Sequence, residues 1–251
     1  MKIITDFNNK RYSADLNQPL DISLPLKEGL DTVNCFWAAY METVPVRMGS
    51  FIGSTKEGGV VNFQTVKFTP RGNGTHTECV GHISKETYTI NQNLQRFHFI
   101  AQLLTLYPQR LENGDRVILK EQFEGNLVDN IDALIIRTAP NDDLKKRTNY
   151  SGSNPPYIHY EAMQYIVTHG IQHLLVDLPS VDKENDGGKL LAHKAFWKYP
   201  EAIRTNSTIT ELIYIPNTII DDLYLLNIQI ASFEIDASPS KPVLYQLSIH
   251  N

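Results

Sequence analysis

The sequence contains few cysteines and no long hydrophobic run. Cys35 and Cys79 are the two cysteines among 251 residues, and two thiols cannot form the disulfide framework of a small secreted domain. No segment approaches the roughly 18 consecutive apolar residues of a membrane-spanning helix, and no apolar segment follows Lys2 as it would in a secretory signal. We therefore expect a cytoplasmic protein with reduced thiols and no membrane partner.

The sequence also lacks an excess of positive charge. Its 23 lysine and arginine residues are outnumbered by 28 aspartate and glutamate residues, which gives a formal net charge of −5 at pH 7. Proteins that bind nucleic acid, or the anionic surface of a membrane, usually present a clear excess or stripe of basic residues. The charge balance therefore argues against nucleic acid and anionic membranes as partners.

The chain has enough apolar residues to build a core. Hydrophobic residues make up 41% of the sequence, which is ordinary for a globular protein. A chain of this length buries about 70% or more of its unfolded surface without help from disulfides or metals. Because neither an internal repeat nor a linker-like tract divides the sequence, we expect residues 1–251 to form a single domain.

The hydrophobic pattern predicts a strand-rich α/β or α+β domain. Residues 133–140 are rich in β-branched and apolar side chains, as strands are. Residues 157–170 place apolar side chains at helical spacing and end at Gly170, a residue type common just after a helix. An apolar strand is expected directly afterwards, which makes half of a parallel crossover unit. Among the other segments, strands are predicted at 21–29, 58–70 and 227–235, and a loop is predicted at 71–83.

The densest group of chemically useful side chains lies between Gly74 and His82. His76 and Glu78 are two residues apart, so an extended backbone places both side chains on one side. An imidazole beside a carboxylate is a common ligand pair for Zn²⁺ or Mn²⁺. His82 is near enough in the sequence to act as a third ligand or to carry protons. The simpler interpretation is that such a pair arises by chance in a chain with eight histidines.

His193 and Glu211 lie far downstream, and neither residue by itself indicates a metal site. A histidine beside an apolar segment is more often a structural residue, and a glutamate at the start of a strand is more often solvated. Their value depends on whether the fold brings them to His76 and Glu78.

Several stretches together resemble the cyclase family of metal-dependent hydrolases, which includes bacterial kynurenine formamidase (arylformamidase) and isatin hydrolase. Residues 74–78, with the sequence Gly-Thr-His-Thr-Glu, and His82 are similar to the family signature His-x-Gly-Thr-His-x-Asp-x-x-x-His. His193 and Glu211 match a downstream histidine and glutamate of the family. The order and the approximate spacing hold from about residue 20 to the C-terminus. The other stretches that carry the resemblance are Asp21–Leu26, Ala133–Thr138 and Gly170–Asp182.

The resemblance implies both a fold and an activity. The implied fold is a swivelling β/β/α type with a central, partly barrel-like sheet and outer helices, assembled as a homodimer or a higher homo-oligomer. The implied activity is hydrolysis of a C–N bond in an amide, formamide or lactam, so the expected partner is a small-molecule substrate.

The resemblance also assigns roles to particular residues. A divalent metal, zinc or manganese, is the expected cofactor, and His82 is expected to carry protons during catalysis. Phe36 and Trp37 are expected to line the substrate pocket, although aromatic residues more often belong to the core. Two carboxylates and two imidazoles would neutralise one divalent ion, which suits a partly buried site. The residues expected to hold the metal are His76, Glu78, His193 and Glu211.

Two positions depart from the family signature. Gly72 stands where the family has its first histidine, and Glu78 replaces an aspartate with a side chain one methylene longer. The missing ligand suggests a single ion, a weaker second site or a different metal. It also leaves open an alternative, a non-catalytic member that binds a small molecule or a metal. Arg71, beside the gap, is more simply a solvated loop residue than a contact for a substrate carboxylate. A structural or interaction protein would bind no metal at all.

Overall fold

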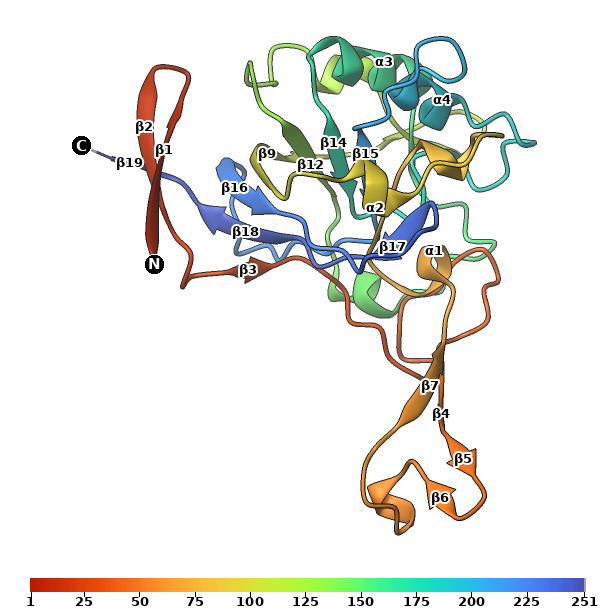
Figure 1. The fold of residues 1–251 in the computed structure, drawn as a ribbon. Coiled ribbons are helices and arrows are strands. Elements are labelled where there is room, and N and C mark those ends of the chain that lie inside the picture. The colour runs from red at the N-terminus through yellow and green to blue at the C-terminus, as the bar shows by residue number, and fades with distance from the viewer. Residues whose placement is uncertain (251) are drawn as a thin grey trace.

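The computed structural model describes residues 1–250, and its main body is built around one nine-stranded sheet. Two smaller parts project from this body, a hairpin at the N-terminus and an arm that carries β4 to β7 (Figure 1). The strands of the main sheet, in spatial order, are β17 (Ala237–Pro239), β8 (His76–Glu78), β15 (Thr208–Glu211), β14 (His173–Val176), β12 (Ala133–Thr138), β9 (His98–Leu106), β16 (Leu223–Asn227), β18 (Val243–Gln246) and β3 (Leu20–Asp21).

The four neighbouring strands β15, β14, β12 and β9 in the middle of this sheet run parallel. Every residue of β12 and β14 is buried, as expected for parallel strands that are covered on both faces. The register pairs Ile135 with Leu175 and Leu175 with Thr210. The carboxyl ends of β14 and β15 therefore lie side by side, and the antiparallel strands β8 and β17 continue the sheet beyond β15.

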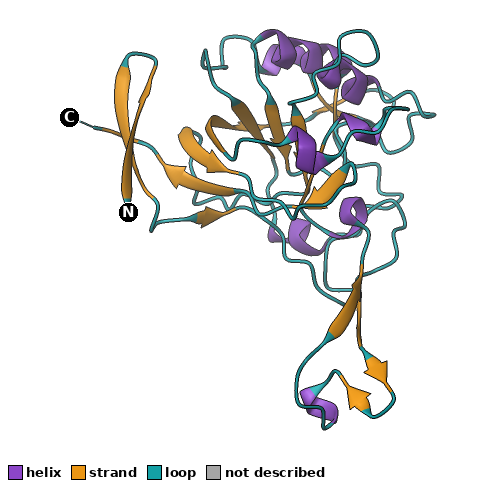
Figure 2. Cartoon of the chain, viewed as in Figure 1, coloured by secondary structure: helices purple, strands orange, loops and turns teal. Residues whose placement is uncertain are grey.

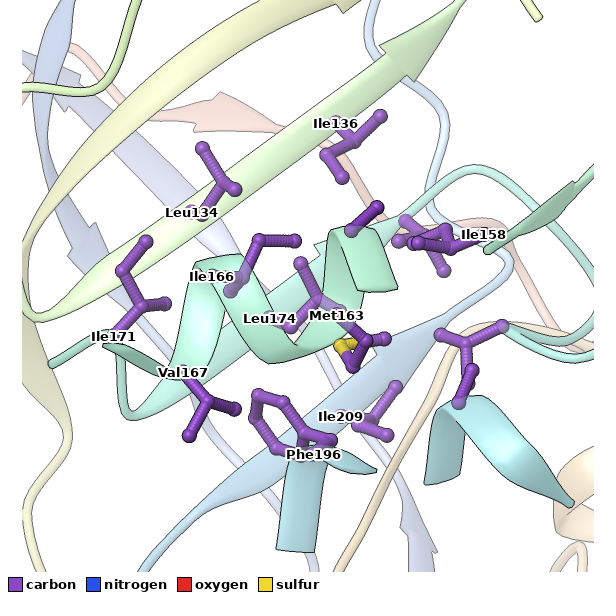
Figure 3. Close-up of a cluster of buried hydrophobic side chains, with 14 of the residues drawn as sticks. Leu134, Ile136, Ile158, Met163, Ile166, Val167, Ile171, Leu174, Phe196 and Ile209 are labelled. Atoms are coloured by element: carbon purple, nitrogen blue, oxygen red, sulfur yellow. The ribbon is translucent and has the colours of Figure 1, made fainter. Parts of the chain in front are cut away.

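The helices α3 (Tyr160–Thr168) and α4 (Leu191–Trp197) belong to the core that covers one face of the parallel strands. Figure 3 shows Met163 and Ile166 of α3 close to Leu134 and Leu174 of the sheet, with Phe196 of α4 beside them. Burying a side chain of this size contributes about 1.5 to 3 kcal/mol. This packing fixes α4, and with it His193, relative to the sheet.

The helix predicted over 157–170 is present in its central part as α3. Met163 and Ile166 are buried on its inner face, and Gly170 has a φ of +77°. That left-handed conformation, which costs glycine little, lets the chain leave the helix. Ile158 belongs instead to the short strand β13 (Tyr157–Ile158), which pairs with β11 (Arg116–Ile118).

The remaining helical elements are short, as Figure 2 shows. Among the described residues, no helix is both long and apolar enough to span a membrane. The short elements are α1 (Pro70–Asn73), α2 (Ile90–Asn93), η1 (Thr55–Glu57), η2 (Val80–His82), η3 (Lys120–Gln122) and η4 (Asp143–Arg147).

The two projecting parts consist of small antiparallel sheets. The terminal hairpin, β1 (Lys2–Phe7) and β2 (Lys10–Asp15), is joined by β19 (Ser248–Ile249). A separate small sheet contains β10 (Gln109–Arg110), which pairs with β11. The arm, residues 42–67, contains β4 (Glu42–Pro45), β5 (Arg47–Met48), β6 (Phe51–Ile52) and β7 (Gln64–Lys67). Several apolar residues of the arm, among them Val44 and Phe63, are more than half exposed.

The prediction of a loop over 71–83 is wrong, because this segment contains β8 between the short helices α1 and η2. The polar residues and glycines of the segment carry no local signal for a strand. β8 forms because it pairs with β15 on one side and β17 on the other, and such pairing outweighs the local preference of the residues.

Three predicted strands are misplaced or too long. The strand predicted over 21–29 is limited to Leu20–Asp21, and the strand predicted over 58–70 is limited to Gln64–Lys67. The strand predicted over 227–235 lies earlier, as β16. Apolar residues in each segment point to a strand, but hydrogen bonding to a neighbouring strand decides where it begins and ends.

Candidate metal centre

Three elements bring the four predicted metal ligands together. His76 and Glu78 lie on the same face of β8 because they are two residues apart. The antiparallel register places His76 directly opposite Glu211 of β15. His193 reaches the group from the buried side of α4. All four side chains are almost completely buried, with at most 3% of each residue exposed.

His76 is held so that one ring nitrogen faces the centre. Its Nδ1 lies 3.0 Å from the carbonyl oxygen of Gly74, and because a carbonyl only accepts, Nδ1 carries the hydrogen. Nε2 lies 3.4 Å from Oε2 of Glu211 and is buried without a hydrogen-bond partner. Burial disfavours the charged ring, but Glu211 outweighs it and raises the pKa of His76. The site therefore attracts a cation at this nitrogen, a proton or a metal ion.

His193 is oriented in the same way by a carboxylate. Its Nδ1 lies 2.6 Å from Asp182 Oδ2, while its Nε2 lies 3.2 Å from Glu78 Oε1 and 3.8 Å from Glu211 Oε1. Burial disfavours the imidazolium, but the bonds to Asp182 and Glu78 raise the pKa of His193 to about 10. A histidine whose outer nitrogen is bonded to a carboxylate is the usual arrangement in metal sites.

Asp182 also fixes the start of α4. Its carboxylate accepts the backbone N–H groups of Ala192, at 2.7 Å, and His193, at 3.1 Å. One carboxylate thus positions both the backbone and the ring of His193. Asp182 lies at the end of the stretch 170–182 that carries the family resemblance, but the sequence alone did not assign it a role.

The two glutamates place two negative charges in a buried space. Burial raises and the neighbouring histidines lower the pKa of Glu78, and the net shift is downward. For Glu211, burial and the charge of Glu78 raise the pKa. Glu211 Oε1 accepts the backbone N–H of Val181 at 3.0 Å, which leaves Oε2 directed at His76. Two carboxylates in such a space need positive charge nearby to remain ionised.

His82 lies at the more open side of the group. Its side chain is 26% exposed, with Nε2 3.9 Å from Glu78 Oε2 and Nδ1 3.9 Å from Asp236 Oδ2. Burial lowers the pKa of His82 to about 4, although the charge of Glu78 opposes the shift. The ring is therefore neutral at pH 7, so it can accept a proton or bind a metal ion.

Potential ligand atoms gather in two overlapping groups. Ligand atoms of His76, Glu78 and Glu211 lie within 4.8 Å of one another, and so do those of Glu78, His82 and His193. Glu78 is common to both groups. Imidazole nitrogens and carboxylate oxygens are suitable donors for Zn²⁺ and Mn²⁺, so the donor set and the unpartnered Nε2 of His76 fit a divalent metal ion.

The gap in the family signature has a structural cause. A Cβ atom at Gly72 would lie 2.2 Å from the Cβ of Ala38, so the fold leaves no room for a histidine there.

Arg71, the preceding residue, is not merely solvated. Its Nε donates to Glu78 Oε2 at 3.2 Å, and its guanidinium also pairs with Asp236. Nothing in the sequence near Asp236 indicated this contact.

Phe36 and Trp37, the predicted substrate residues, lie on a turn next to α1. Both have positive φ, 55° and 52°, and their exposed fractions are 41% and 74%. The preceding residue, Cys35, donates its backbone N–H to the carbonyl of Gly72 at 3.1 Å. The turn therefore packs against the segment that carries Arg71, and the role of the two rings in substrate binding stays a prediction.

The fold and the site together define a mixed α/β protein with a buried centre suited to a divalent metal ion. Residues 15–183 match a family model, Cyclase, which is described as "Putative cyclase". Since this match spans more than half of the chain, the chain belongs to the Cyclase family. A comparison with curated proteins found no match.

Solved structures of the same type cover almost the whole chain. A potential metal-dependent hydrolase with cyclase activity is 13% identical, with a TM-score of 0.66 over 91% of this chain and 97% of its own. Isatin hydrolase A from Ralstonia solanacearum is 9% identical, with a TM-score of 0.67 over 91% of each chain. Isatin hydrolase A from Labrenzia aggregata, bound to benzyl benzoate, is 11% identical, with a TM-score of 0.66 over 91% and 93%. The predicted cyclase-type fold, with its central curled sheet and outer helices, is confirmed.

Proposed function

We propose that the chain is a metal-dependent hydrolase that cleaves the C–N bond of an amide, formamide or lactam. The observation that carries this proposal is the convergence of two imidazoles and two carboxylates in one buried space. Both imidazoles, His76 and His193, have Nδ1 bonded to an outer acceptor, so that Nε2 faces the carboxylates. The isatin hydrolases among the similar structures support a hydrolase that acts on a cyclic amide.

A divalent cation, Zn²⁺ or Mn²⁺, suits this donor set. The residues that would hold it are His76, Glu78, His193 and Glu211. The two glutamates carry two negative charges, which one such ion neutralises within a space that excludes most water. When bound, the ion supplies Lewis acidity toward a carbonyl oxygen and activates water at neutral pH.

His82 is the residue that we propose moves the proton. A neutral imidazole takes the proton from water as the water attacks the carbonyl carbon, and it returns that proton to the departing nitrogen. The lowered pKa of His82, about 4, keeps the ring neutral before the reaction. Its partial exposure allows a substrate to approach it from the open side of the centre.

The substrate would contact the turn that carries Phe36 and Trp37. Positive φ is unfavourable for aromatic residues such as Phe36 and Trp37, and backbone strain of this kind clusters at functional sites. The turn is fixed by the backbone N–H of Trp37, which donates to Ser151 Oγ at 2.9 Å. We expect an aromatic substrate to stack on an exposed ring here, so Trp37→Ala should raise KM more than it lowers kcat.

A second candidate function is binding without catalysis. It is favoured by one observation, the contact between Arg71 and Glu78 in place of the missing histidine. In that case the purified protein would contain metal but would hydrolyse none of the compounds tested.

The test combines metal content with turnover. Purified chain is assayed for metal by mass spectrometry and then for hydrolysis of aryl-formamides and cyclic amides. We expect the double variant with His76→Ala and Glu78→Ala to lose both the metal and the activity. His159 and Glu161 offer a matched control, because they form a second His-x-Glu pair, 3.7 Å apart, on the surface. Unchanged metal content in the first variant would reject the ligand set.

We also propose that the chain forms a homodimer or a higher homo-oligomer. Support comes from the arm, residues 42–67, on which Val44, Met48, Val60 and Phe63 are each more than half exposed. Clustered apolar side chains on a projecting element usually mark an interaction surface. Light scattering coupled to gel filtration should give the mass of at least two chains, and the mass of one chain would contradict this. The cytoplasmic location stays a prediction.

A further inference from the structure

The two carboxylate oxygens of Glu78 face two different partners. Oε1 lies 3.2 Å from Nε2 of His193, on the side shared with Glu211. Oε2 accepts a hydrogen bond from Nε of Arg71 at 3.2 Å and lies 3.9 Å from Nε2 of His82. Arg71 therefore places a positive charge beside Glu78 and His82, two members of the second group of potential ligands. With His193 assigned to the first ion, these two residues would otherwise remain for a second cation.

The local structure holds Arg71 in this position. The chain turns through α1 directly before β8, and Gly72 packs against Ala38 with no space for a side chain. Arg71 itself is only 31% exposed in its side chain and is paired on its outer side with Asp236. Because Arg71 already faces two carboxylates, its charge is committed to the protein and not to a substrate carboxylate.

We propose that the guanidinium of Arg71 takes the place and the charge of a second metal ion, so that this centre holds one ion. The proposal rests on the metal-dependent function proposed above. Glu78, Glu211 and Asp236 carry three negative charges, which one divalent ion and one guanidinium balance. Asp182 carries a fourth negative charge, which hydrogen bonds from two backbone N–H groups and from the ring of His193 stabilise. A second divalent ion would place an excess of positive charge beside Arg71.

The test counts metal ions per chain in the wild type and in Arg71→Gln. Metal-free protein is titrated with Zn²⁺ or Mn²⁺ in a calorimeter, and bound metal is counted by mass spectrometry after dialysis. We expect one ion in the wild type and two in Arg71→Gln, because the variant removes the positive charge beside Glu78 Oε2. Arg96→Gln is the matched control, since it removes the same charge from an exposed arginine next to Asp132; it should retain one ion.

The outcomes separate this proposal from the proposed function. Two ions in the wild type, or one ion in a folded Arg71→Gln variant, would overturn the role of Arg71 and leave the metal-dependent function intact. No bound ion in the wild type would overturn both. If Arg71→Gln does not fold, the wild-type titration still decides, because a second binding step refutes the proposal. Arg71→Lys, which keeps the charge, should also bind one ion.

Discussion

Replacement of Asp182 by asparagine tests how the centre orients His193. The carboxylate accepts from the Nδ1–H of His193 and from the backbone N–H groups of Ala192 and His193. Asparagine keeps one of the two acceptor oxygens and replaces the other with an NH₂ group, which cannot accept from an N–H group of Ala192 or His193. The ring of His193 then loses the negatively charged acceptor that holds its hydrogen on Nδ1, so Nε2 is less firmly fixed as the nitrogen available to a metal ion.

The expected magnitudes follow from these contacts. Loss of an outer partner of a metal-binding histidine typically lowers metal affinity about 10- to 100-fold, which corresponds to about 1.4 to 2.7 kcal/mol. The metal-free protein should also lose stability, because a buried hydrogen bond to a charged group contributes about 1.5 to 3 kcal/mol. Asp182→Asn should therefore weaken both folding and metal binding without abolishing either.

The assay measures metal affinity by calorimetry and the free energy of unfolding by urea titration of the metal-free protein. Asp186→Asn is the control, since Asp186 accepts backbone N–H groups of Gly188 and Leu190 in the same loop but does not contact His193. A metal affinity unchanged in Asp182→Asn, or reduced equally in Asp186→Asn, would refute the reasoning.

Three further predictions concern other parts of the molecule. His82→Ala should reduce turnover about 100-fold or more while the ion count stays at one; an unchanged kcat would exclude the proton transfer. Gly72→Ala should lower the free energy of unfolding by about 1 to 3 kcal/mol, because the new Cβ would lie 2.2 Å from that of Ala38; a neutral effect in urea titration would contradict this packing. Burial lowers the pKa of His173 from 6.5 to about 3, so protons bind the unfolded chain preferentially and stability falls as the pH drops below about 6.5. Between pH 7.5 and pH 5 the wild type should lose about 2 kcal/mol more than His173→Gln, and an equal loss in the two proteins would contradict this.

The sequence was most informative where local patterns repeat over several residues. The buried strand β12 and the helix α3 were expected from apolar spacing, and the position of Gly170 after the helix agrees with its φ of +77°. The strand β8 was not expected, because its hydrogen bonds go to β15 and β17, which are distant in the sequence. Periodicity reports which face of an element is buried but not which neighbour it pairs with.

The candidate site could be predicted only in part for the same reason. His76 and Glu78 formed a visible pair, whereas His193 and Glu211 gained meaning from the family resemblance before the fold brought them near. Arg71 could not be assigned, because its partners depend on the space removed at Gly72 and on the distant Asp236. Such contacts arise from tertiary packing, and no short motif records them.

Anomalous scattering from crystals grown with Zn²⁺ or Mn²⁺, recorded on both sides of the metal absorption edge, tests the central claim most directly. The account predicts one edge-dependent peak per chain, bordered by His76, Glu78, His193 and Glu211. A centre without such a peak at saturating metal, or a peak only at a different place on the chain, would contradict it.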